Sequence, residues 1–225
     1  MSLTKLPLSM MADGTDGNII TYNASGNPAA VSTGSSGQVL TSAGTGSPPT
    51  FAAATASGWQ FVSFQNISDD STVNFESFES GFDYQIWGYD MIPGTDNKYL
   101  YGRFGTGSTT YQTSNYSHQL FERYAGTSAN NEDLNASHIQ MTGVYFGNQT
   151  NEQGSFRVDI FNPMDSAAYT HMHFQGLFIQ GTPAGAVVIG GAFREADEAV
   201  TAFQMYMSSG NINGRFYLYK RKNTT

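Results

Sequence analysis

The sequence predicts an all-β protein with two parts: an extended N-terminal segment over residues 1–57 and an antiparallel β-sandwich over residues 58–225. Short stretches with strand-like alternation recur at intervals of about 10–20 residues after position 58. No helical period longer than about two turns lies between them. Composition also changes sharply near Gly58, from Gly, Ser, Thr and Ala to aromatic-rich sequence. Many short strands without interleaved helices are typical of a sandwich or jelly roll.

The N-terminal segment carries little charge and little apolar surface. Its only charged residues are Lys5, Asp13 and Asp16. We expect two short strands, 18–22 and 38–41. Similar dipeptides, Asp16-Gly17 and Ser36-Gly37, precede the two strands, and turn residues follow each of them. Alone, they bury too little apolar area to offset about 1–2 kcal/mol of backbone entropy per residue. Two alternatives remain open here: a flexible tether, or a segment that identical copies order by winding round a shared axis.

The C-terminal part is expected to form eleven strands and hardly any helix. In the strand at 155–161, Phe156, Val158 and Ile160 share one face while Arg157 and Asp159 take the other. Turn residues at 162–165 and 209–214 predict hairpins, and 194–199 is the best short helical candidate. The predicted strands are 59–65, 72–78, 84–92, 98–104, 119–124, 139–146, 155–161, 169–179, 186–193, 201–208 and 215–220.

Composition excludes several classes of function. The chain has 225 residues, no cysteine and a formal charge of −8 with only ten Lys and Arg. The missing cysteine excludes a disulfide scaffold, a thiolate zinc site and thiol catalysis. The acidic balance disfavours nucleic acid as a partner, and no apolar run reaches the ~18–20 residues of a membrane span. The first eleven residues do not read as a signal peptide.

Three segments resemble tail-fibre proteins of tailed bacteriophages. Residues 14–28 read GTDGNIITYNASGNP, and residues 37–51 read GQVLTSAGTGSPPTF. Both are similar to a segment that often precedes a distal fibre domain. Residues 201–219, TAFQMYMSSGNINGRFYLY, are similar to the closing hairpin of many such domains. The resemblance covers roughly the first fifty and the last twenty residues, and none of these phrases is a catalytic motif.

This resemblance implies a homotrimeric virion protein of the tail, made in the host cytoplasm. Its N-terminus would attach to a tail or baseplate protein, and its C-terminal domain would adhere to a host surface glycan or protein. It favours a partly ordered shaft over a tether, although the chain lacks the heptads of longer fibres. The alternatives are a capsid decoration or head-fibre protein and, as an enzyme, a capsule-degrading glycan hydrolase.

The segment Tyr169-Thr-His171-Met-His173 is the densest group of metal-ligating residues. On a strand, His171 and His173 project from the same face, and three chains around an axis would offer six nitrogens. Some phage fibre tips bind iron through repeated His-x-His motifs on their threefold axis, whereas the motif occurs once here. The alternative is an ordinary polar sheet face, with Arg157 and Asp159 as neighbours. No other cofactor is expected.

The sequence contains no catalytic motif, but it contains residues suited to binding a receptor. Glu76 and Glu79 would point to opposite faces of a strand and so do not form the carboxylate pair of a glycosidase. Tyrosines and amides gather in two polar stretches, 105–118 and 126–138, which we expect to form long loops. We therefore predict a host-facing surface there, and its candidate contact residues are Tyr111, Tyr116, His118, Asn130 and Asn131.

Overall fold

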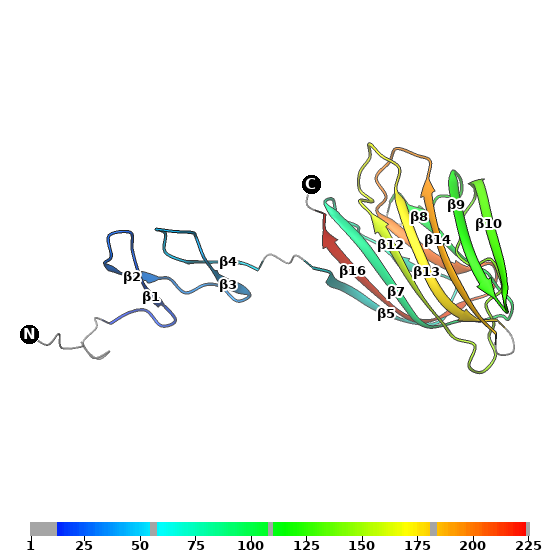
Figure 1. Ribbon diagram of the computed structural model, residues 1–225, viewed down its shortest axis with the longest axis horizontal. Coiled ribbons are helices and arrows are strands. Elements are labelled where there is room, and N and C mark those ends of the chain that lie inside the picture. The colour runs from blue at the N-terminus through cyan, green and yellow to red at the C-terminus, as the bar shows by residue number, and fades with distance from the viewer. Residues whose placement is uncertain (1–12, 55–57, 108–109, 181–183, 224–225) are drawn as a thin grey trace, which may run out of the picture. The chain divides into compact units, whose positions relative to one another are not determined.

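The computed structural model describes residues 13–54, 58–107, 110–180 and 184–223. They fall into two compact units on either side of residues 55–57, which lie outside the described residues. The sequence places the boundary after residue 57. Within the described residues every regular element is a β-strand, and the strands pair in antiparallel sheets. The all-β prediction is therefore confirmed (Figure 1).

The first unit consists of two hairpins built on a repeated turn. Asn18 N–H donates to the Thr15 carbonyl, and Gln38 N–H donates to the Ser35 carbonyl, each at 3.1 Å. Gly17 and Gly37 both adopt a positive φ in these turns, 80° and 85°, which glycine allows without strain. The similar phrases of the sequence thus form similar turns. The hairpins are β1 (Ile19–Tyr22) with β2 (Pro28–Val31), and β3 (Gln38–Thr41) with β4 (Thr50–Ala53).

The second unit contains two sheets. The large sheet has eight strands in the order β10-β9-β14-β13-β12-β7-β16-β5, and the small sheet has four in the order β11-β8-β15-β6. Figure 1 shows the large sheet as a curved layer. The strands are β5 (Gln60–Asp70), β6 (Val73–Phe75), β7 (Phe82–Pro93), β8 (Leu100–Gly105), β9 (Tyr116–Tyr124), β10 (Thr127–Ala136), β11 (Ile139–Gln140), β12 (Gly154–Phe161), β13 (His171–Ile179), β14 (Gly185–Arg194), β15 (Ala202–Met207) and β16 (Ile212–Lys222).

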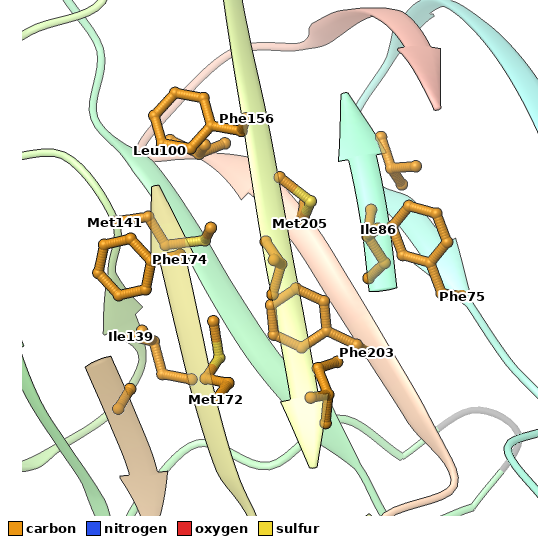
Figure 2. Packing of buried hydrophobic residues seen from close by; sticks show 14 of the residues in the cluster. Phe75, Ile86, Leu100, Ile139, Met141, Phe156, Met172, Phe174, Phe203 and Met205 are labelled. Carbon is orange, nitrogen blue, oxygen red and sulfur yellow. The ribbon is translucent and has the colours of Figure 1, made fainter. Parts of the chain in front are cut away.

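The two sheets share one apolar core. Phe75 of the small sheet contacts Phe216 of the large one, with ring centroids 6.3 Å apart. Figure 2 shows Phe203 and Met205 beside side chains of the large sheet, all in one buried cluster. Burial alternates along β12 as the sequence predicts, with Phe156, Val158 and Ile160 inside. Alternation of this kind leaves the opposite face of the large sheet outside the core.

Several sequence predictions about this unit are wrong. Residues 126–138 contain β10 rather than a long loop, because the two-residue turn Ala125-Gly126, with φ of 47° and 82°, folds this segment back on β9. The stretch 139–146 holds only the two residues of β11 as strand, and 194–199 forms no helix. Residues 209–214 do not close a hairpin either, since β15 pairs within the small sheet and β16 within the large one. The hairpin at 162–165 is confirmed, because β12 and β13 are paired neighbours.

A candidate binding surface on the large sheet

The face of the large sheet that points away from the small sheet carries a continuous row of side chains. We call this face the outer face. Its residues alternate with buried ones along β12, β13, β14 and β9, so the fold itself presents them outward. Strand register places one residue from each of the eight strands side by side, in the order Phe64, Tyr217, Trp87, Arg157, Gln175, Ile189, Phe121 and Asn130.

One end of this face is aromatic and held by hydrogen bonds. The rings of Trp87 and Tyr89 are nearly parallel, with centroids 5.9 Å apart. Trp87 Nε1–H donates to Gln85 Oε1 at 2.6 Å, and Gln85 Nε2–H donates to Asp159 Oδ1 at 2.6 Å. Asp159 also pairs with the Arg157 guanidinium at 2.8 Å. This chain of bonds fixes the orientation of the polar side chains, so little rotamer entropy remains to be lost on binding.

A hollow with both polar and apolar lining residues lies beside the centre of the face. It has a volume of about 410 Å³, and Gly191 of β14 contributes no side chain to fill it. His171 and His173 line one wall, and Gln119 and Glu132 line the other. Imidazole, amide and carboxylate groups together offer both donors and acceptors. The hollow therefore suits a ligand rich in hydroxyl groups, and the ring of Phe193 at its border adds an apolar surface.

The two histidines line this hollow and share one face of β13, and the sequence predicts the shared face. His171 and His173 are both exposed while Met172 is buried, so the two imidazoles share the outer face. Asp159 lies directly opposite His173 in the sheet register, which confirms it as a neighbour of the pair. In the described part of the chain, no three His, Cys, Asp or Glu side chains come together to hold a metal ion. A metal at this pair would need its remaining ligands from water or from other copies of the chain.

The predicted receptor residues are scattered, and two of them, Tyr116 and His118, are buried. Tyr116 is fully buried, its hydroxyl accepts a bond from Phe104 N–H at 2.8 Å, and burial raises its pKa to about 12. His118 is also buried, and desolvation lowers its pKa. This placement corrects the prediction for both residues, because their positions on β9 are in phase with buried Leu120. Tyr116 does not reach the surface, whereas His118 is among the residues that line the hollow although it is almost fully buried.

The other three predicted residues are accessible to different extents. Tyr111 is half-buried, and its hydroxyl donates to Glu76 Oε1 at 3.2 Å. Desolvation, together with the nearby Glu76 carboxylate, raises the pKa of Tyr111. Asn130 is exposed and ends the row across the outer face, whereas Asn131 lies on the opposite side of β10 and is half-buried. Only Asn130 therefore belongs to the candidate binding surface.

Sequence reasoning missed a buried carboxylate in the same strand. Glu122 is fully buried and accepts hydrogen bonds from Gly143 N–H and Val144 N–H, the latter at 2.9 Å. Burial raises the pKa of Glu122, and these backbone bonds partly offset the increase. Glu122 lies two residues after the apolar Leu120 on the same strand, so the alternation in the sequence already places it on the buried face. Glu122 fixes the segment after β11 to β9 and lies away from the outer face.

Neither a known protein family nor a curated protein matches this sequence. Within the residues that the structure describes, no helix is long and apolar enough to cross a membrane.

Proposed function

We propose that this chain is a structural virion protein of a tailed phage, a short trimeric tail fibre or fibre tip that binds a host surface glycan or protein. Residues 1–57 would form an extended attachment and shaft segment. Residues 58–225 would form a jelly-roll-like sandwich that carries the receptor site. The proposal rests on the resemblance of residues 14–28, 37–51 and 201–219 to tail fibres, together with the surfaces described above.

The observation that carries the proposal is the exposure of large apolar side chains in the N-terminal hairpins. Among the described residues of this unit, Val31 is the only hydrophobic side chain that is buried. Five others remain substantially exposed, and these are Ile19, Ile20, Tyr22, Val39 and Leu40. Two hairpins with so little core are not stable alone in water. Sister copies would supply the missing apolar contacts and would turn the segment into a shaft.

The outer face supports adhesion. The hollow over Gly191 combines hydrogen-bonding groups on two walls with an aromatic ring at its border, which matches the hydroxyl and C–H faces of a sugar. A shallow, open site of this kind binds weakly by itself. Several copies on one particle would multiply weak contacts into firm attachment.

The test is binding of the full chain to a printed array of bacterial surface glycans. Gly191→Val fills the hollow without strain, because a Cβ there meets only ordinary contacts at 3.5 Å or more. We expect this variant to lose at least tenfold in apparent affinity. The control is Gly58→Val, at an exposed position before the large sheet where an added Cβ meets nothing within 4 Å, and it should leave binding unchanged.

The outcomes separate adhesion from the alternatives. Retained binding by Gly191→Val would remove the hollow from the receptor site. Absence of binding both to the array and to bacterial cells would contradict adhesion itself. Release of new reducing ends from a bound polysaccharide would instead identify a glycan hydrolase.

A further inference from the structure

The outer face also carries an exposed apolar patch beside the hollow. We define the apolar patch as Phe121 of β9, Leu177 of β13, and Val187 and Ile189 of β14. Their exposed fractions are 50%, 53%, 49% and 59%. Register makes the set contiguous, because Ile189 lies opposite Phe121 and Val187 lies opposite Leu177. With Trp87 and Tyr89 at its border, the exposed apolar area is roughly 500 Å², at the upper end of what monomers show.

The patch has the relief of a packing surface. Val187 and Ile189 form a ridge between two hollows, one of about 360 Å³ on the Trp87 side and one of about 470 Å³ on the Phe121 side. A ridge flanked by hollows can interlock with a matching ridge from a second sheet face. An area of roughly 500 Å², extended by the polar residues around it, approaches the ~800 Å² that each partner buries in a stable complex.

The chemistry of the patch favours a protein partner. Three of its four side chains are branched aliphatics, which provide no flat ring for a sugar and no hydrogen bonds for its hydroxyls. Exposed charges of both signs flank it, Arg123 and Glu132, while Arg157 and Asp159 already pair with each other within the chain. A second copy of the same face, turned about a symmetry axis, can therefore pair each sign with its opposite.

We infer that the apolar patch is an interface between copies of this chain, in which the outer faces of the C-terminal domains pack against one another. This inference rests on the proposed function, because a shaft would hold the copies together at high local concentration. The ridge of Val187 and Ile189 enters the hollow beside Leu177 of a neighbouring copy. The hollow over Gly191 then lies at the edge of this interface and is repeated once in each copy.

The test uses a single cysteine as a reporter of burial. The chain has no native cysteine, so Ile189→Cys introduces one thiol on the ridge. The matched control is Ser80→Cys, at an exposed position in the turn before β7. The rate of thiol reaction with a maleimide is measured for the full chain, together with the mass of the assembly in solution. Val187→Cys repeats the measurement in case Ile189→Cys disturbs the sheet, which near-ultraviolet circular dichroism monitors.

Each outcome decides the inference. A trimeric mass with a ridge thiol that reacts at least tenfold more slowly than Cys at position 80 supports it, provided that urea removes the difference. A trimeric mass with equal reactivities overturns the interface and leaves the proposed fibre intact. The mass of a single chain contradicts both, whatever the reactivity of the thiol.

Discussion

Replacing two exposed apolar residues of the N-terminal hairpins should weaken the assembly of the chain. Ile20 in β1 and Leu40 in β3 are 56% and 46% exposed, although both lie in regular strands. If copies cover them in a shaft, Ile20→Thr and Leu40→Thr remove apolar contact while keeping residues that suit a strand. The hairpin ladders depend on backbone hydrogen bonds and should persist.

The expected effect follows from the exposed fractions. Full burial of an Ile or Leu side chain is worth about 1.5–3 kcal/mol, so the exposed half still has about 1 kcal/mol to gain on assembly. Two such residues in each of three copies give about 6 kcal/mol per trimer. Since about 1.4 kcal/mol corresponds to a tenfold change, the trimer association constant should fall by about four orders of magnitude.

Sedimentation equilibrium of the full chain over a range of concentrations measures this change. The control is Thr50→Ser in β4, an exposed position where only a methyl group is lost. Urea unfolding of the C-terminal domain should be the same in all variants, because its core is separate from these residues. A wild-type chain that stays monomeric, or a double variant that assembles as well as wild type, would refute the reasoning.

Two further predictions concern the C-terminal domain. Glu122→Ala should lower the free energy of unfolding by roughly 2–4 kcal/mol, because it leaves Gly143 N–H and Val144 N–H without an acceptor, whereas Glu122→Gln keeps an acceptor and should cost less. Burial raises the pKa of Glu122 in the folded state. Above pH ~4.5 the folded state therefore binds more protons than the unfolded state. As a result, the free energy of unfolding of wild type decreases as pH rises through the raised pKa. The free energy of unfolding of Glu122→Gln relative to that of wild type should therefore increase with pH over that window, and a constant difference would contradict the sign. The second prediction concerns His171 and His173. If they form only a polar wall, the variant with both changed to Ala should keep the wild-type mass of the assembly, and EDTA should leave the mass of the wild type unchanged. Metal that is found in the purified wild-type assembly and is lost in this variant would instead establish the metal site.

Local patterns predict part of the fold because neighbouring residues decide it. Alternation along β12 reveals which side chains face the core, and the phrases Asp16-Gly17 and Ser36-Gly37 indicate turns that need a positive φ. By contrast, the sheet to which a strand belongs depends on partners far away in sequence. β15 and β16 look like a hairpin because a Gly- and Asn-rich stretch joins them, yet they pair in different sheets.

The candidate site was harder to predict for a related reason. β10 is rich in Asn, Asp and Glu, which have low β-propensity, so its sequence looks like a loop until β9 is there to pair with it. That error placed one part of the expected receptor surface in residues 126–138. The phase of Tyr116 and His118 was missed in the other part, 105–118, because the next strand was expected to begin at 119, whereas β9 begins at Tyr116. The row from Phe64 to Asn130 exists only after eight strands take their register, and no local pattern contains it.

Receptor binding and assembly would then share one sheet face yet remain separable by mutation. Gly191 lies in the hollow and Ile189 on the ridge, two positions apart on the same strand and with side-chain positions on the same face. Filling the hollow at Gly191 should reduce binding by each copy without changing the mass. Placing a charge at Ile189 should instead separate the C-terminal domains and leave each hollow intact. The affinity of a single domain would then stay the same, and binding by the particle would fall only because the three hollows of a fibre are no longer held in a fixed arrangement.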